Sequence, residues 1–224
     1  MTVLATFILS LLAGVLQPYF CTDEGAQLQY VRTGISSGKT VWNHTMSIDS
    51  VRRAPDGSLQ IAYSSDIRKP GGKKRNGGPI RLALSVDGSG TVLMDIASSA
   101  ASVLRNLLPD KMVRCDGGET PLRSDLRPGD SLPDIYSTVS AGAVKCRFSV
   151  TERSVVRAET ISTPAGSFDC IVVSEHRVTR GPGFSEDKVT LTWYARGIGM
   201  VRHDTIFASR PEKSTSELLV SVKK

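Results

Sequence analysis

The chain has 224 residues, of which 40% are hydrophobic and 22% are charged. This ordinary composition excludes a chain that is disordered throughout, because disorder goes with low hydrophobicity and high net charge. The 28 Lys and Arg residues exceed the 22 Asp and Glu residues, which gives a formal net charge of +6. Such an excess favours anionic partners without selecting one of them.

An uncharged segment opens the chain. Residues 3–21 contain no Lys, Arg, Asp or Glu, and the apolar run has the length of a signal-peptide core and is short for a membrane span. No Lys or Arg precedes the run, so a buried N-terminal strand or helix is the alternative interpretation. We predict a signal peptide over residues 1–22, a single β-rich domain over residues 23–224, and export to the periplasm or the periphery of the outer membrane.

The four cysteines form no metal-binding pattern. Cys115, Cys146 and Cys170 lack a CxxC pair and the spacing of a zinc site. If Cys21 leaves with the signal peptide, one disulfide and one free thiol remain possible among these three, and the sequence does not choose the pair. Cys21 would itself suit a lipid anchor, but Phe20 is far bulkier than the small residue usually found before a lipidated cysteine. We therefore expect no lipid anchor, no metal and no cofactor.

Alternating apolar and polar residues predict strands at about residues 41–48, 59–67 and 80–86. The turn formers at residues 55–57 join the first two strands in a hairpin. Six residues on the apolar faces of these strands are the candidate ligand-binding residues: Trp42, Met46, Ile61, Tyr63, Leu82 and Leu84. The alternative is that these side chains simply fill a core.

The connection between the second and third of these strands is strongly basic. It reads Arg-Lys-Pro-Gly-Gly-Lys-Lys-Arg over residues 68–75, and such a run could attract anionic lipid headgroups or nucleic acid. No aromatic residue lies within the run to stack on bases, which disfavours a nucleic-acid partner. We interpret the run as a solvated hairpin tip.

The period changes to that of a helix after residue 95. Ala and Leu recur at helical spacing, Asp95 suits the N-cap, and Pro109 ends the pattern. These features predict one amphipathic helix over residues 96–108. Residues 115–134 follow with three prolines, three glycines and five acidic residues, which predicts a long loop or cap.

Longer alternating segments return in the second half, at about residues 143–158, 168–179, 188–194, 200–206 and 217–222. No alternation of strands with helices is visible, which argues against a parallel sheet. The predicted fold is therefore mainly β: a large curved antiparallel sheet or half-open barrel of about nine or ten strands with one amphipathic helix.

Two motifs in this half carry a family resemblance. Thr-Pro-Ala-Gly-Ser-Phe-Asp-Cys over residues 163–170 and Trp-Tyr-Ala-Arg-Gly-Ile-Gly-Met-Val over residues 193–201 resemble the TapB-like family of exported bacterial proteins, related to a β-rich envelope domain of unknown function. The resemblance implies export, a β-rich fold and a kinship in shape with lipoprotein-carrier folds, in which a curved sheet wraps an apolar cavity. It implies no catalytic residue.

No nucleophile and base stand together in the sequence. His44, His176 and His203 are scattered, and strand neighbours such as Glu175 and His176 point to opposite faces. His176 and His203 could meet only across adjacent strands. The alternating pattern around Cys170 predicts a buried structural thiol rather than a nucleophile. We therefore predict no catalytic residue and a protein that is not an enzyme.

The predicted function is that of an envelope protein that holds an apolar or amphipathic ligand, such as a lipid, in the concavity of its sheet. The alternative is a non-catalytic interaction or assembly module that docks to another envelope protein. In that case the acidic segment 115–134 and the basic segment 68–75 would supply opposite charges. The state of the concave face, open and apolar or packed shut, distinguishes the two hypotheses.

Overall fold

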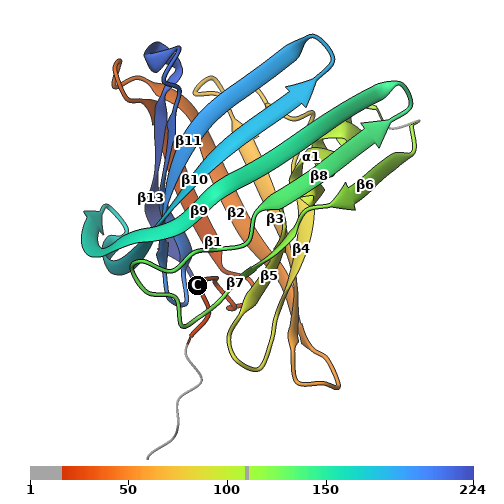
Figure 1. The fold of residues 1–224 in the computed structure, drawn as a ribbon. Coiled ribbons are helices and arrows are strands. Elements are labelled where there is room, and N and C mark those ends of the chain that lie inside the picture. Colours follow the sequence, from red (N-terminus) through yellow and green to blue (C-terminus); the bar gives the residue numbers. More distant parts are fainter. Residues whose placement is uncertain (1–16, 109–110) are drawn as a thin grey trace, which may run out of the picture.

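The structure is a computed structural model that describes residues 17–108 and 111–224. Within these ranges thirteen strands form one antiparallel sheet in the order β6-β8-β9-β10-β11-β12-β13-β1-β2-β3-β4-β5-β7 (Figure 1). The strands of the first half are β1 (Gln27–Gly34), β2 (Thr40–Arg53), β3 (Leu59–Arg68), β4 (Ile80–Val86), β5 (Val92–Asp95), β6 (Val113–Gly117) and β7 (Glu119–Leu122). Those of the second half are β8 (Ile135–Ala141), β9 (Val144–Thr163), β10 (Gly166–Gly181), β11 (Phe184–Ala195), β12 (Gly199–Ile206) and β13 (Thr215–Lys223).

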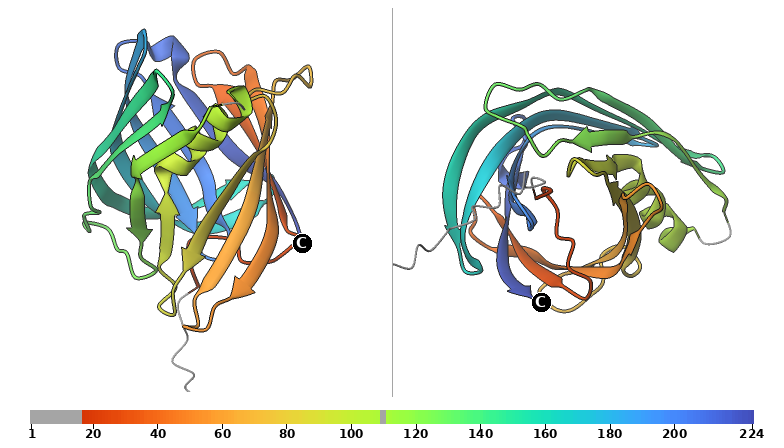
Figure 2. Two further views of the ribbon diagram at one scale, coloured as in Figure 1. Left: turned by 90° about the vertical axis from the view of Figure 1, so that its right-hand side faces the viewer. Right: turned by 90° about the horizontal axis from the view of Figure 1, so that it is seen from below.

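The sheet curls into a barrel that is nearly closed (Figure 2). Its two edge strands, β6 and β7, follow each other in the chain and are joined through Gly118. A side chain at Gly118 would meet the carboxylate of Asp95 at 2.7 Å and the β-carbon of Ala97 at 2.8 Å, and its φ is +113°. Glycine is therefore needed where the chain crosses from one edge of the barrel to the other. The predicted half-open barrel is confirmed.

The α-helix α1 (Ile96–Leu107) lies against β4, β6, β7 and β8, beside the two edges of the sheet. The carboxylate of Asp95 accepts a hydrogen bond from the backbone N–H of Ala97 at 2.8 Å, as expected of an N-cap. Ala97 and Ala101 are buried against Val139 of β8, which their small size allows. The sequence-based helix, with its N-cap, is confirmed. A short 3-10 helix, η1 (Pro211–Lys213), lies between β12 and β13.

The strand count was too low because residues 113–141 form β6, β7 and β8, where the sequence pattern predicted a long loop or cap over residues 115–134 and no strand before residue 143. β6 and β7 have five and four residues and are edge strands, which seldom show the alternation of a half-buried strand. β7 also contains Pro121, a residue that is tolerated at the edge of a sheet and discourages a strand prediction. Tertiary pairing therefore created strands that local propensity did not favour.

The antiparallel order places alternate connections at opposite ends of the barrel (Figure 1). We call one the open end; it holds residues 35–39, 69–79, 142–143, 182–183 and 207–214. The other is the closed end; it holds residues 54–58, 87–91, 123–134, 164–165 and 196–198, with the N-terminal segment 17–26.

The closed end is filled by the main hydrophobic core. Leu28, Ile48, Ile61 and Leu219 are at most 1% exposed there, and each such side chain contributes about 1.5–3 kcal/mol by its burial. The core spans strands from both halves of the chain, so it holds the two halves together as one unit.

The N-terminal segment corrects one expectation. Residues 1–16 of the predicted signal peptide 1–22 lie outside the described residues, but Tyr19, Phe20 and Cys21 are buried in the main core. The backbone N–H of Gly197 donates to the carbonyl of Pro18 at 2.7 Å. The prediction that everything before Asp23 is without a role in the core is therefore wrong for this short stretch, which closes the barrel from below.

All four cysteines are free, so the disulfide considered from the sequence is not formed. Cys115 and Cys146 both lie opposite Val139, on the two sides of β8. Two strand spacings of about 4.8 Å separate them, which exceeds the reach of a disulfide. Cys21 and Cys170 are buried in the core.

Candidate functional site

The upper part of the barrel interior contains a cavity of about 620 Å³ toward the open end. Nine strands, α1 and the β3–β4 connection contribute to its wall. Its charged and titratable lining residues are Arg32, His44, Arg75, Arg177, Glu186, Lys188, His203 and Glu217. Four Lys or Arg side chains therefore face two carboxylates, and the interior here is polar and cationic instead of apolar.

Glu217 of β13 organises one side of the cavity. The Nε atom of Arg32 donates to its carboxylate at 2.8 Å, and His44 Nδ1 lies 2.8 Å from its other oxygen. Burial by itself would raise the pKa of Glu217, but the hydrogen bond from His44 and the charge of Arg32 lower it to about 2. The carboxylate is therefore ionised at neutral pH and holds the ring of His44 in place.

His44 also reaches Ser65 of β3, whose Oγ lies 2.7 Å from His44 Nε2. Ser65, His44 and Glu217 thus have the contacts of a serine-hydrolase triad. Two features oppose that function. Arg32 already neutralises Glu217, which weakens its support for an imidazolium, and Ser65 lies within the sheet, paired with Met46 and Ile80. The backbone N–H groups around Ser65 are therefore used by the ladder and cannot form an oxyanion hole.

A second buried carboxylate, Glu175 of β10, lies deeper in the wall. Arg153 Nε donates to one of its oxygens and Arg177 Nε to the other, each at 2.9 Å. Burial would raise the pKa of Glu175, but the two arginines outweigh it and lower the value to about 2. Arg153 also donates to Thr120 and to the carbonyl of Pro133, each at 2.6 Å. This cluster ties β7 and β9 to β10 behind the cavity.

His203 lies on the same wall as a neutral polar group. Burial, followed by the charges of Arg177 and Arg32, lowers its pKa to about 3, and its Nδ1 atom lies 2.8 Å from Thr192 Oγ1. The ring therefore adds no positive charge at neutral pH. The cationic character of the cavity comes from its arginines and Lys188.

Trp42 lies between two arginines near the open end. The guanidinium of Arg32 is 4.5 Å from the centre of its ring and that of Arg75 is 3.8 Å away. Burial, and next the charge of Arg32, lowers the pKa of Arg75, which makes no salt bridge among the described residues. Arg75 is exposed and lines the mouth of the cavity, whereas Lys69, Lys73 and Lys74 are exposed and do not line it.

A second cavity, of about 350 Å³, continues the first along α1. The two share Ser99, Ala100, Phe148, Arg177, Thr179 and Lys188. The smaller one adds the apolar side chains of Tyr63, Leu82, Met94 and Ile96. The interior above the core therefore combines a cationic chamber with an apolar groove beside the helix.

The six candidate residues from the sequence fall into three settings. Met46, Ile61 and Leu84 are buried in the main core. Tyr63 and Leu82 line the apolar groove. Trp42 lies between Arg32 and Arg75, at the open end of the strand that carries Met46.

Sequence analysis missed the charged residues of the chamber. Arg32, Glu217 and Arg177 come from three distant segments, and nothing in their local sequence brings them together. A weak signal existed: on β11, Glu186 and Lys188 occupy alternate positions with Thr190, Thr192 and Tyr194, so that a whole strand face is polar. A polar strand face of this kind is compatible with a barrel interior that contains water.

The remaining sequence candidates are separate from one another. His176 lies on the outer side near Asp187, 2.8 Å from its Oδ1 atom, and does not meet His203. Cys170 is buried, as predicted, and its burial raises the pKa of its thiol to about 12. In the described part of the chain, no group of three or more His, Cys, Asp or Glu residues is placed to hold a metal ion.

A family model described as DUF3108-like matches residues 24–218. The chain belongs to the DUF3108-like family. No curated protein is found to match it. The relatives found do not carry the TapB-like name, which remains a resemblance.

Two crystal structures share the fold. The "putative exported protein with YmcC-like fold" from Bacteroides fragilis is 21% identical, with a TM-score of 0.72 over 93% of this chain and 100% of that one. The "putative lipoprotein" from Parabacteroides distasonis is 16% identical, with a TM-score of 0.72 over 92% and 99% of the two chains. At these identities the likeness establishes the fold alone. Among the helices of residues 17–108 and 111–224, none has the length and apolar character to cross a membrane.

Proposed function

We propose that this DUF3108-like protein is an exported binding protein that holds an amphipathic, anionic ligand inside its barrel without changing it chemically. The observation that carries the proposal is the continuity of the cationic chamber with the apolar groove beside α1. A carboxylate or phosphate would find Arg75 and Lys188 within the chamber, and a hydrocarbon chain would find Leu82 and Met94 along the groove. Charge-assisted hydrogen bonds from Arg or Lys bind such groups well.

The ligand class is narrower than the sequence suggested. Arg32, Arg177 and Lys188 are already paired with carboxylates of the protein. A purely apolar ligand would displace water from the guanidinium of Arg75, which is unpaired among the described residues, without supplying a counter-charge, which is costly. A small anion alone would leave the groove empty. A ligand with a charged head and an apolar tail satisfies both parts of the interior.

A matched pair of ligands tests the proposal. Laurate and dodecanol have the same chain length and differ in the carboxylate, and binding is followed by the fluorescence of Trp42, with Trp42→Phe as the blank. We expect laurate to bind about tenfold more tightly, because a hydrogen bond to a charged group contributes about 1.5–3 kcal/mol. Lys188→Gln should weaken laurate alone, whereas Leu82→Ala should weaken both ligands. Equal affinities, or no binding of either ligand, would contradict the proposal.

The absence of catalysis is part of the proposal and has its own test. A fluorophosphonate reacts with activated serines, so the purified protein is incubated with it and Ser65 is examined by peptide mass spectrometry. We expect no labelling, because Arg32 neutralises Glu217 and the sheet leaves no oxyanion hole. Labelling of Ser65 that disappears in His44→Gln would show that the cavity is an active site.

Export is supported by the kinds of protein that share the fold, one an exported protein and one a lipoprotein by their names. Periplasm and outer-membrane periphery are both compatible with it. A lipid on Cys21 is not part of the proposal, since this residue is 0% exposed within the core. N-terminal sequencing of protein from the native host would locate the processing site, and an intact Met1 on cytoplasmic material would contradict export.

The alternative of an interaction module relied on opposite charges at residues 68–75 and 115–134. These segments do not form a single surface: the first lies at the open end, whereas the second forms β6, β7 and part of the closed end.

A further inference from the structure

The two ends of the barrel carry opposite charge. In the described residues, the open-end connections and the end of the α1–β6 connection hold eight Lys or Arg residues against one acidic residue: Lys39, Lys69, Lys73, Lys74, Arg75, Lys111, Arg210 and Lys213 against Glu212. The closed-end connections, with the N-terminal segment 17–26 and Lys224, reverse this balance, with four against seven: Arg123, Arg127, Arg196 and Lys224 against Asp23, Glu24, Asp56, Asp87, Asp125, Asp130 and Asp134. The positive charge is thus concentrated around the mouth of the cavity.

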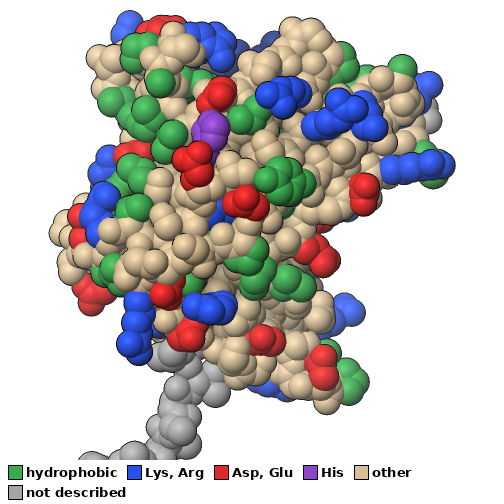
Figure 3. Space-filling model, viewed as in Figure 1, with side chains coloured by type: hydrophobic (Ala, Val, Ile, Leu, Met, Phe, Trp, Pro, Cys, Tyr) green, Lys and Arg blue, Asp and Glu red, His purple; other side chains and the backbone are tan. Residues whose placement is uncertain are grey.

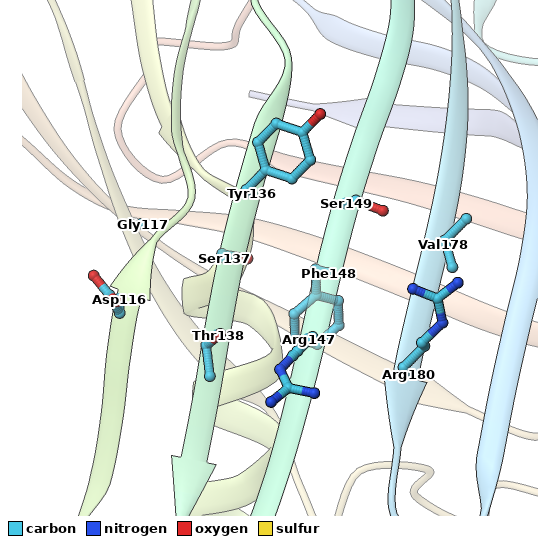
Figure 4. A pocket seen from close by; sticks show the side chains of 10 residues that line it. All are labelled: Asp116, Gly117, Tyr136, Ser137, Thr138, Arg147, Phe148, Ser149, Val178 and Arg180. Carbon is cyan, nitrogen blue, oxygen red and sulfur yellow. The ribbon is translucent and has the colours of Figure 1, made fainter.

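Two arginines at the ends of strands add to the positive charge around the mouth of the cavity, which we call the rim. Arg147 of β9 lies directly opposite Arg180 of β10, on the outer face, beside a groove of about 420 Å³. Figure 4 shows the two guanidinium groups on the same face of the sheet. Neither forms a salt bridge within the described residues, and like charges placed directly opposite each other are destabilising. Figure 3 shows Lys and Arg side chains gathered over the ends of β8, β9 and β10.

Apolar side chains project from the same end. Of the large exposed hydrophobic residues, Ile35 and Val41 flank the β1–β2 turn, Leu107 and Met112 flank the end of α1, and Phe184 follows the β10–β11 turn. Met112 is 67% exposed and Phe184 is 48% exposed. The end of α1 belongs to this rim, because Asn106 Nδ2 donates to the carbonyl of Pro79 at 3.2 Å.

We infer that the open end is a docking surface for an anionic phospholipid membrane. Lys and Arg near such a surface are attracted to its headgroups, and exposed apolar side chains enter the interface between headgroups and acyl chains. Nucleic acid would use the cations and leave Ile35, Met112 and Phe184 without a role. Docked in this way, the protein presents the mouth of its cavity to the lipid.

Vesicle flotation tests the surface on the full chain. The probes are vesicles of equimolar phosphatidylcholine and phosphatidylglycerol, vesicles of phosphatidylcholine alone, and a short DNA duplex. The open-end variant carries Lys73→Gln, Lys74→Gln and Arg180→Gln. A matched closed-end control carries Arg52→Gln, Arg53→Gln and Arg127→Gln, which are equally exposed. Removal of Arg180 also relieves its repulsion with Arg147, so the variant is expected to fold.

Each neutralised open-end charge should weaken partitioning to the anionic vesicles about fivefold, and the three together about a hundredfold. The control variant should partition as the native protein does. Phe184→Ser should weaken partitioning to the anionic vesicles by a further factor of about ten, since it removes an aromatic side chain that docking would bury in the lipid interface.

Three results would overturn the inference. One is equal partitioning to neutral and anionic vesicles. The second is an equal loss in the open-end and closed-end variants, which would indicate an effect of net charge alone. The third is tight binding of the duplex together with no effect of Phe184→Ser, which would identify a general polyanion surface. None of these variants changes a residue that lines the cavity. Loss of membrane docking can therefore be observed while ligand binding is retained, and loss of ligand binding while docking is retained.

Discussion

The two halves of the barrel interior differ in character, although the same strands form both: one is apolar and packed, and the other is polar and contains a cavity. At the closed end Leu28, Ile48 and Ile61 point inward and pack shut. At the open end the same strands β1, β2 and β3 point Arg32, His44 and Ser65 inward, around a cavity of about 620 Å³. One strand face thus changes from apolar to polar along its length. The lower half supplies the stability that lets the upper half keep buried charges and empty space.

The largest expected effect concerns residues 19–21, which fill the closed end of the barrel. Deleting residues 2–22 removes Tyr19, Phe20 and Cys21 from the core, and loss of one buried Phe alone costs about 3–5 kcal/mol. Deleting residues 2–16 leaves these three side chains in place. Urea denaturation should give a much lower midpoint for the longer deletion than for the shorter one. Equal midpoints would mean that residues 19–21 contribute nothing to the stability of the core.

The next effect concerns the buried ion cluster between the two halves. Glu175→Gln leaves Arg153 and Arg177 without their carboxylate, and breaking a buried pair in this way costs about 3–5 kcal/mol. Glu186→Gln is the matched change at the more exposed pair with Lys188, where the expected loss is below about 1 kcal/mol. The free energy of unfolding in urea distinguishes them. A small loss for both variants would contradict the role given to Glu175.

Two leucines on one strand sharpen the comparison most directly. Leu84 and Leu82 share the inner face of β4, but Leu84 is buried in the main core and Leu82 lines the groove beside α1. Leu84→Ala should destabilise the protein by about 2–5 kcal/mol. Leu82→Ala should cost about 1 kcal/mol, because it enlarges an existing cavity instead of creating one. If thermal denaturation gives equal losses, the groove is packed as tightly as the core.

The smallest effect is a dependence of stability on pH. The pKa values of Glu175 and Glu217 are lowered to about 2 in the folded protein, so the unfolded chain binds protons first as the pH falls. Their contribution is complete above about pH 5 and is lost as the pH falls toward 2, with each carboxyl losing on the order of 1 kcal/mol by pH 4. Urea denaturation at pH 7 and pH 4 measures this loss. In Glu217→Gln the slope should be shallower; an unchanged slope would contradict the assignment.

The local sequence pattern was sufficient to locate an element wherever a strand or helix had one apolar and one polar face. Alternation located β2, β3 and β4, and the spacing of Ala and Leu located α1 together with its cap at Asp95. It failed at β6 and β7, which are short edge strands that exist because they pair with β8 and β5. It also failed at residues 19–21, which resemble a targeting segment in composition and are buried in the core.

The sequence by itself determined the class of fold, the position of the helix, the burial of Cys170 and the excess of positive charge. Only the tertiary structure decided that the interior is divided into a packed core and a cationic chamber. The reason is that Arg32, His44, Ser65 and Glu217 lie on four strands that become neighbours through pairing of β1 with β13, near the two ends of the described chain. Periodicity reports which face of a strand points inward, and the closure of the sheet decides what that face meets.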